Sequence, residues 1–200
     1  KNNGLIDEIE LFKPDLTLSP TVNELRKRNL GIELSLKNEC NYHMSMDSDE
    51  YYVIDEFKNM CKILIDIDYD VCLYQMVTYY KDFNHRLEPK ETYYVPGLHK
   101  INSNTIYDVN YPSPVLVDPT RKVNGLKFKI LEREDIEMHH MSYVRKDLNK
   151  KLNNSSANSN FNNINEVVKY YNNWEYPQKG LICGINNWYS ELIKVKKLFN

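Results

Sequence analysis

The first extended pattern of apolar residues predicts a helix over residues 20–38. Ser19 is a good N-cap, and Pro20 suits the first helical position because its missing N–H would have no intrahelical partner there. Apolar residues then recur with a broadly helical period, at Val22, Leu25, Leu30, Ile32, Leu34 and Leu36. We expect this apolar face to be buried against a sheet.

A short apolar run that breaks abruptly into acidic residues follows this helix. Residues 42–46 predict a buried strand, and Asp47, Ser48, Asp49 and Glu50 form the loop directly after it. Ligands of α/β proteins bind at the ends of such strands. The acidic loop is therefore the first candidate for a functional site.

The remaining pattern alternates helices with strands and short extended pieces. Next along the chain we predict a helix over 54–64, a solvated acidic turn over 66–70 and a strand over 71–80. Proline and glycine then separate short extended pieces around 93–95, 115–117 and 126–130. The last predicted elements are a strand over 137–143, a basic helix over 145–152, a polar loop over 153–163 and a helix over 164–174. No repeat is visible, so we expect one α/β domain over residues 1–200.

Charge and hydropathy remove several classes of function. The chain has 200 residues, with 26 Lys and Arg against 28 Asp and Glu, and a formal net charge of -2. No overall positive field attracts nucleic acid or an anionic membrane, so any recognition of phosphate must be local. No window approaches the ~20 apolar residues of a membrane span, and the first residues lack the features of a signal peptide.

The cysteines and the first residue bear on the setting of the chain. Cys40, Cys61, Cys72 and Cys183 form no CxxC pair, which fits reduced thiols in the cytosol better than disulfides or a zinc site. The chain starts with Lys1 rather than Met, which suggests a fragment of a longer protein.

Asp47 and Asp49 are the leading candidates for a metal site. Two carboxylates one residue apart at a strand end can face one cleft, where Mn²⁺ or Mg²⁺ binds their oxygens and keeps positions free for a diphosphate. His139 and His140 offer a neutral imidazole that would complete the metal shell. The alternatives are an ordinary acidic turn and a surface histidine pair.

Basic residues follow the two histidines at Arg145, Lys146, Lys150 and Lys151. The guanidinium group of arginine binds two phosphate oxygens at once, so this cluster is a candidate phosphate site. The alternative is a solvated basic face of a helix.

Three segments resemble one family of enzymes. NELRKRNLGIELSLKNECNYHMSMDSDEYY is similar to the helix, strand and DxD segment of GT-A glycosyltransferases. YPSPVLVDPTRKVNGLKFKI and MHHMSYVRKDLNKKLNNSSA resemble later blocks of small family-2-like glycosyltransferases of bacteria and large DNA viruses, including enzymes that glycosylate algal-virus capsid proteins. The resemblance implies one GT-A domain with a mixed, mostly parallel central sheet flanked by helices.

The resemblance also assigns site residues. It implies that Asp47 and Asp49 hold the metal, with Asp49 the more direct ligand, and that His140, or alternatively His139, completes the site. Donor and phosphate contacts are expected from Arg28, Asn29, Asp47, Tyr143, Arg145 and Lys146. GT-A enzymes start with a strand and loop that bind the nucleobase, and little before Leu5 can supply them. The first strand either lies upstream or is rearranged.

An inverting transferase also needs a carboxylate that takes the proton of the acceptor hydroxyl. Asp118 is the first choice because it follows an apolar run and precedes Pro119, although an Asx turn before proline explains it equally well. Glu134 and Asp135 are the alternatives, and both also suit the start of a short helix. Among the aromatic residues, Trp174 is our candidate for stacking on a sugar ring.

The function expected from the sequence is a metal-dependent, inverting transfer of a sugar from a nucleoside-diphosphate donor. We expect UDP-sugar as donor, a glycan or glycoprotein as acceptor, Mn²⁺ or Mg²⁺ as cofactor, and no nucleic acid or membrane span. The expected location is the cytoplasm, or the host cytoplasm or virion for a viral protein. The alternatives are a noncatalytic sugar- or nucleotide-binding domain and a nucleotidyltransferase, although no Gly-rich phosphate loop is visible near the start.

Overall fold

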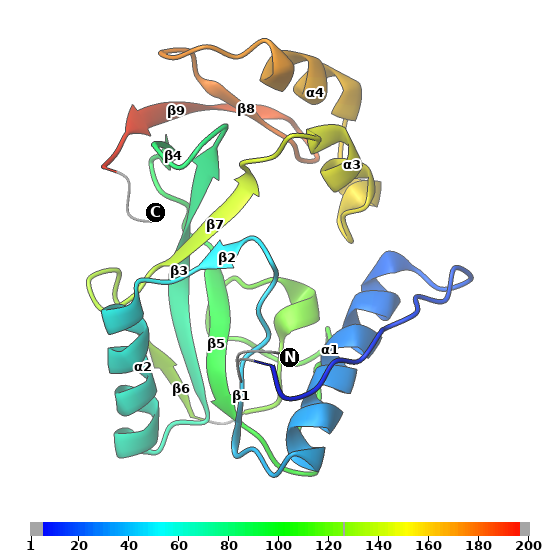
Figure 1. Cartoon of the computed structure of the whole chain (residues 1–200), viewed down its shortest axis with the longest axis vertical. Coiled ribbons are helices and arrows are strands. Elements are labelled where there is room, and N and C mark those ends of the chain that lie inside the picture. Colours follow the sequence, from blue (N-terminus) through cyan, green and yellow to red (C-terminus); the bar gives the residue numbers. More distant parts are fainter. Residues whose placement is uncertain (1–5, 126, 197–200) are drawn as a thin grey trace.

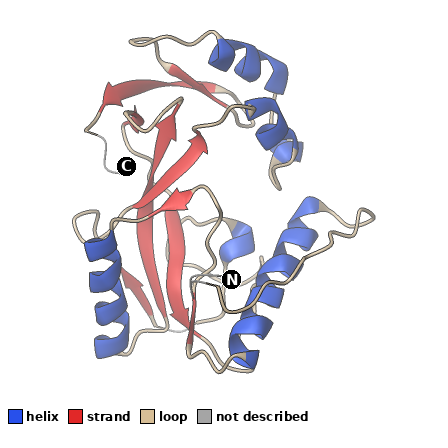
Figure 2. Cartoon of the chain, in the orientation of Figure 1, coloured by secondary structure: helices blue, strands red, loops and turns tan. Residues whose placement is uncertain are grey.

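The computed structural model describes residues 6–125 and 127–196. Its helices are α1 (Pro20–Lys37), α2 (Ile54–Ile67), α3 (Leu148–Asn153) and α4 (Ile164–Asn172), with short 3₁₀ turns η1 (Pro119–Arg121) and η2 (Asn158–Asn160). Its strands are β1 (Tyr42–His43), β2 (Glu50–Tyr51), β3 (Val71–Tyr80), β4 (His85–Glu88), β5 (Tyr94–Lys100), β6 (Phe128–Ile130), β7 (Met138–Tyr143), β8 (Gly180–Ile182) and β9 (Trp188–Lys194). Figure 2 shows how these helices flank the strands.

The long strand β3 organises the whole sheet. Its first half pairs with β5 on one edge and with β6 on the other, and its second half pairs with β7 and β4. The main strand order is β1-β5-β3-β4-β9-β8. Figure 1 shows a lower body, made of α1, α2, β1, β5, β6 and η1, and an upper lobe, made of β4, β8, β9, α3 and α4. Both β3 and β7 run from the lower body into the upper lobe.

The prediction of a mostly parallel central sheet is wrong. Among the described residues, the strand pairs β1·β5, β2·β7, β3·β4, β3·β5, β4·β9 and β8·β9 are antiparallel, and β3·β6 and β3·β7 are parallel. The physical reason is the connections. A parallel neighbour needs a long crossover, whereas hairpins such as β3 to β4 and β8 to β9 return the chain directly as an antiparallel neighbour.

Several single elements form where the sequence predicts them. The side chain of Ser19 caps α1 by accepting from the backbone N–H of Val22, and this helix ends at Lys37. Its Ile32 is buried beside Val71 and Leu73 of β3, as expected for the apolar face. The strand predicted over 71–80 is β3 itself. Helix α2 starts at the predicted residue and extends three residues past the predicted end.

The predicted buried strand over 42–46 is largely absent. Only Tyr42 and His43 form a strand, β1, and both are half-buried. Their ladder with β5 ends at the pair of His43 and His99, after which the chain leaves the sheet edge and crosses toward β2. The acidic residues therefore lie in an irregular segment and in β2, not at the end of a long central strand.

Separate apolar clusters lie above and below the middle of β3. Tyr80 packs in the upper lobe against α3, α4 and β8, whereas Tyr74 packs in the lower body against α2 and β5. Trp174 belongs to the upper cluster, is 7% exposed and donates its indole N–H to the carbonyl oxygen of Gln178 at 2.9 Å. Its prediction as a sugar-stacking residue is wrong, because the ring is part of the core.

Gly97→Ala should destabilise the lower body. Gly97 lies in β5, and a Cβ placed there would come 2.3 Å from the hydroxyl oxygen of Tyr74, whose ring is fully buried. Overpacking of a filled core costs about 1–3 kcal/mol, and we expect a loss in this range in urea unfolding. Unchanged stability would show that the Tyr74 ring can shift at no cost.

Candidate functional site

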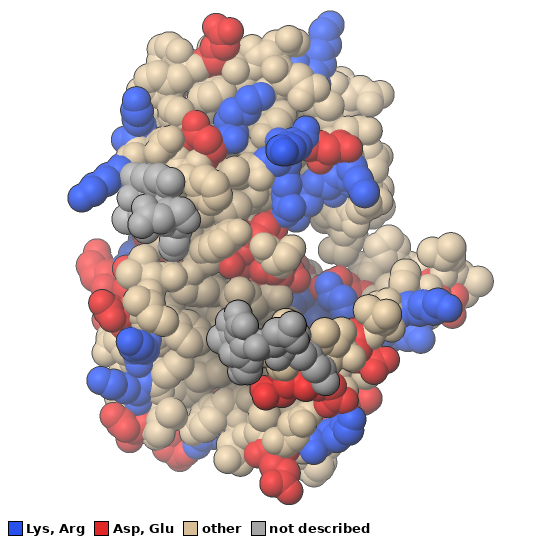
Figure 3. Space-filling model, in the orientation of Figure 1, with Lys and Arg blue, Asp and Glu red and all other residues tan. Residues whose placement is uncertain are grey.

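A large cleft separates the upper lobe from the lower body. Its volume is about 1580 Å³, enough for a ligand larger than an ordinary small molecule. Its walls come from α1, the segment 43–50, the segment 87–95, β7, α3 and the hairpin of β8 and β9. Figure 3 shows Lys and Arg side chains gathered on the upper lobe above a group of Asp and Glu side chains in the middle of the molecule.

A network of charged side chains on the lower wall, here the lower cluster, surrounds Asp47. Arg121 contacts both the carboxylate of Glu50 and Asp47 Oδ2, the latter at 2.8 Å. Arg28 adds contacts to Glu24 at 2.8 Å and to Asp47 Oδ2 at 3.5 Å. Burial raises the pKa of Asp47, but the charges of Arg121, Arg28 and Lys27 outweigh it and the net pKa is lowered. Asp47 is therefore an anion held within this network.

A second group, here the upper cluster, surrounds Asp49. The Asp49 side chain is 6% exposed, and its Oδ2 atom contacts Arg145, Lys151 Nζ at 2.9 Å and His140 Nε2 at 3.7 Å. Burial raises the pKa of Asp49, but the hydrogen bond and charge of Lys151 and the charges nearby outweigh it and bring the pKa to about 2. One carboxylate thus faces two permanent cations, and the cluster carries excess positive charge.

The two histidines of β7 point to opposite sides of the strand, as the alternation of side chains requires. His140 lines the cleft beside Asp49. His139 is buried, and its Nδ1 atom lies 3.0 Å from the Tyr79 hydroxyl. Burial lowers the pKa of His140 to about 4, against a partial opposite effect of Asp49. Its imidazole is therefore neutral at pH 7 and keeps a nitrogen lone pair that can bind a cation.

The fit of the site to a divalent cation rests on Asp49 and His140. Asp47 and Asp49 belong to different clusters, and within 6–125 and 127–196 no three Asp, Glu, His or Cys side chains converge as a complete metal site. The Asp49 carboxylate, whose Oδ2 atom contacts Arg145 and Lys151, and His140 Nε2, 3.7 Å from that atom, still provide hard oxygen and one neutral nitrogen. Mg²⁺ and similar ions are commonly bound by one or two protein ligands together with the phosphates of the substrate.

The residues expected to contact the donor divide into two groups. Arg28 and Arg145 line the cleft, and the buried Nε atom of each has no hydrogen-bond partner within the described chain. Asn29 instead bonds both backbone groups of Tyr107, with distances of 2.7 and 3.1 Å, and so fastens the segment around that residue to α1. The Asn29 side chain therefore holds the backbone at Tyr107 and does not line the cleft.

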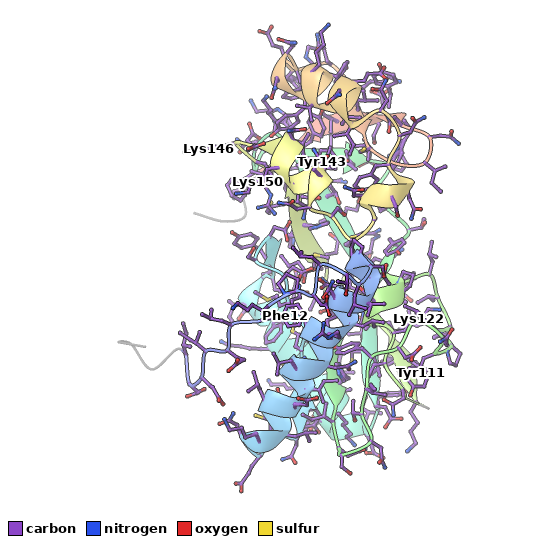
Figure 4. The ribbon with its side chains drawn as sticks, turned by 90° about the vertical axis from the view of Figure 1, so that its right-hand side faces the viewer. Phe12, Tyr111, Lys122, Tyr143, Lys146 and Lys150 are labelled. Atoms are coloured by element: carbon purple, nitrogen blue, oxygen red, sulfur yellow. The ribbon has the colours of Figure 1, made fainter. Side chains whose placement is uncertain are left out.

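Of the other two residues predicted to contact the donor, Tyr143 lies at the cleft and Lys146 does not. The Tyr143 ring is buried at the cleft wall, where its hydroxyl accepts from the backbone N–H of Cys183 at 2.8 Å. Lys146 is exposed and lies outside the set of cleft-lining residues. Figure 4 views the open side of the cleft, with Lys146 projecting from the upper lobe. Lys151, five residues further along the chain in α3, supplies the charge near Asp49 instead.

The three predicted general bases lie in two different places. Asp118 lines the cleft, but its Oδ1 atom accepts from both the backbone N–H and the hydroxyl of Thr120 at 2.8 Å, which is the Asx turn that caps η1. Glu134 and Asp135 lie in the turn between β6 and β7, away from the cleft lining. Asp135 accepts from the backbone N–H of Glu132 at 3.2 Å.

Among the charged residues of the cleft, Glu91 and Arg121 were not identified from the sequence. Arg121 follows an apolar run in a segment with ordinary loop composition, and nothing in that pattern indicates a buried arginine. Glu91 lies between a proline and two tyrosines in a connecting segment. The sequence holds no local signal for either, because their partners are distant along the chain.

Among the described helices, none combines the length and the apolar character that crossing a bilayer requires.

Comparisons with known proteins provide no family for the chain. No protein-family model, curated protein or solved structure matches this sequence or its fold.

Proposed function

We propose that the cleft binds a nucleoside-diphosphate sugar together with a divalent cation, Mn²⁺ or Mg²⁺, and transfers the sugar to a hydroxyl group of a glycan or glycoprotein. The observation that carries this proposal is the upper cluster. There a buried carboxylate, a neutral imidazole and two cations meet at one point of a large cleft.

The balance of charge favours a phosphate ligand at the upper cluster. In the lower cluster, Lys27, Arg28 and Arg121 face an equal number of carboxylates, those of Glu24, Asp47 and Glu50. In the upper cluster, Arg145 and Lys151 share the single carboxylate of Asp49. The Nε atom of Arg145 is buried without an acceptor in the described chain, and a buried donor is normally bonded. A phosphate oxygen would satisfy it.

The chemistry needs positive charge where the diphosphate leaves. As the bond between sugar and phosphate breaks, negative charge grows on the leaving group, and fixed cations lower that barrier without reorganising. Arg145 and Lys151 are already held in place by Asp49. A cation bound by Asp49 and His140 would add further charge stabilisation of the same kind.

Titration calorimetry with Mn²⁺ and UDP tests the proposal. In the wild type, we expect Mn²⁺ to raise the affinity for UDP by about tenfold or more, equivalent to ~1.4 kcal/mol. Asp49→Asn should lose this Mn²⁺ effect, because the carboxylate is replaced by an uncharged amide. It should still bind UDP weakly, since Arg145 and Lys151 remain. Asp66→Asn, an exposed residue of α2 outside the cleft lining, is the matched control and should behave as the wild type.

Lys151→Met separates the phosphate contact from the metal. We expect this variant to bind UDP about tenfold more weakly both with and without Mn²⁺, because it lacks a cation and keeps both proposed metal ligands. Wild-type affinity for UDP that is the same with and without Mn²⁺ would contradict the proposed function. A wild type that does not bind UDP would contradict it as well.

A further inference from the structure

A row of side chains crosses the sheet on the cleft side. In the strand registers, Glu50 of β2 pairs with His140 of β7, and His140 pairs with Thr78 of β3. Beyond Thr78, the Oε2 atom of Glu91 accepts the backbone N–H of Thr78 at 3.1 Å. All four residues line the cleft. Neighbouring strands are ~4.8 Å apart, so Glu91 stands two such steps, on the order of 10 Å, from His140.

The segment that carries Glu91 is held firmly to the sheet. Arg133 donates to the backbone carbonyl oxygen of Glu91 and, at 3.2 Å, to that of Met76 in β3. The adjacent Lys90 donates to both carboxylate oxygens of Glu137, at 2.7 and 2.8 Å. These contacts fix the position of the Glu91 carboxylate relative to β3, which is what a group that acts on a bound substrate requires.

Glu91 also differs from the other carboxylates of the cleft in its partners. Within the described chain, every other cleft-lining carboxylate contacts a cation or caps a backbone turn: Glu24, Asp47, Asp49, Glu50, Glu88, Asp118, Asp147 and Glu191. No described ion pair joins the Glu91 carboxylate to a cation, and it accepts hydrogen bonds from Thr78 and from its own backbone N–H. Within the described chain, Glu91 is therefore the cleft carboxylate that is neither paired with a cation nor part of a turn cap, and Thr78 holds it against β3.

The surroundings of Glu91 strengthen its basicity. Burial raises the pKa of Glu91, and the hydrogen bonds from Thr78 and the charge of Arg133 offset this only in part. The other charged or titratable groups around it are the Lys90 and Glu137 pair and Tyr143. A carboxylate with a raised pKa takes up a proton more readily than Asp49, whose pKa is about 2.

We infer that Glu91 is the general base that accepts the proton of the acceptor hydroxyl group, an inference that rests on the proposed function. The acceptor oxygen forms a bond to the anomeric carbon as the bond from that carbon to the phosphate oxygen breaks. The diphosphate leaves with the electron pair, and the hydroxyl proton passes to the Glu91 carboxylate. The acceptor would lie between Glu91 and the sugar, with the phosphates at the upper cluster, so attack comes from the side opposite the leaving group.

Glu91→Gln tests the role of this carboxylate. The glutamine keeps an oxygen that can accept from Thr78 but cannot take a proton. With UDP-, GDP- and dTDP-hexoses as donors and water as acceptor, we expect its kcat to fall by ~100-fold or more. The Kd for UDP in the presence of Mn²⁺ should stay within about threefold of the wild type, because Glu91 lies away from the phosphate contacts. Glu33→Gln, the same substitution at an exposed residue of α1 outside the cleft lining, is the control and should retain kcat within about threefold.

A pH profile distinguishes the base from a residue that only supports the fold. Over the pH range in which denaturant unfolding shows both proteins to be folded, the wild-type kcat should fall on the acid side as Glu91 is protonated, and Glu91→Gln should lack this fall. A Glu91→Gln kcat within threefold of the wild type would overturn the inference and leave the proposed function standing. Wild-type binding of UDP without turnover of any donor would overturn it together with the transfer step of the proposed function, and would leave the nucleotide site standing. Failure of the wild type to bind UDP would instead overturn both.

Discussion

The free energy of unfolding should fall steeply when the pH is lowered from about 6.5 to about 4. His43, His99, His139 and His140 lie wholly or largely within the protein, and burial lowers the pKa of each from 6.5 to about 4. A shift of this size corresponds to roughly 3 kcal/mol per histidine, so the sum, on the order of 10 kcal/mol, rivals the total stability of a domain. The protein should therefore unfold in weak acid.

The sign follows from proton uptake. In the unfolded chain these histidines bind protons below about pH 6.5, whereas in the folded protein they stay neutral until about pH 4. Between these values the unfolded state binds more protons, so stability rises with pH and is lost as pH falls. Glu50, Glu56 and Glu91 act in the opposite direction, because burial raises their pKa values, and they offset part of the loss.

Urea unfolding at pH 7, 6, 5 and 4 measures this slope. Removal of one titrating group, as in His139→Gln, should lower the slope by up to about 1.4 kcal/mol per pH unit, whatever it does to stability at pH 7. A wild-type stability that is constant between pH 7 and 4.5 would show that the four rings are not neutral in the folded protein.

Arg121→Met should destabilise the protein by about 3–5 kcal/mol. The Arg121 side chain is 7% exposed and joins Glu50, whose side chain is 2% exposed, to Asp47. Burial raises the pKa of Glu50, and Arg121 offsets this only in part, so loss of the guanidinium leaves a buried carboxyl without its cation. Removing one partner of a buried ion pair is costly for this reason.

The double variant Arg121→Met with Glu50→Gln should recover part of this loss, since no unpaired charge then remains buried. Arg26→Met, the same substitution on the exposed face of α1, should change the free energy of unfolding by less than about 1 kcal/mol. Denaturant unfolding of all three variants checks the comparison. Equal effects of Arg121→Met and Arg26→Met would contradict a structural role for the lower cluster.

The elements that the sequence predicts well are those with strong local signals. The N-cap Ser19 and the apolar period of α1 act within the helix itself, and the β-branched and aromatic residues of β3 favour a strand in any context. The direction of the strands is different, because it depends on how distant segments pair. The apolar character of residues 42–46 is compatible with a helix, a strand or a loop. Where the strand ends is decided by its short ladder of pairs with β5.

The candidate site shows the same division. Asp49, His140 and Arg145 are predicted from the sequence as site residues, and the structure places them together in the cleft. It cannot decide between His139 and His140, because neighbouring residues of a strand face opposite sides and the cleft side is set by packing. Arg121 and Glu91 escape prediction because their contacts, to Glu50 and Thr78, arise only when separate segments of the chain meet in the fold.

The path of β3 fixes how the width of the cleft can change. This one strand contributes Tyr74 to the core of the lower body and Tyr80 to the core of the upper lobe, with no hinge segment between them. The lobes can approach or separate only if β3 and its partner β7 bend, and their register already shifts between Thr78 and Tyr80. The resting curvature of these two strands therefore sets the separation between the cleft walls.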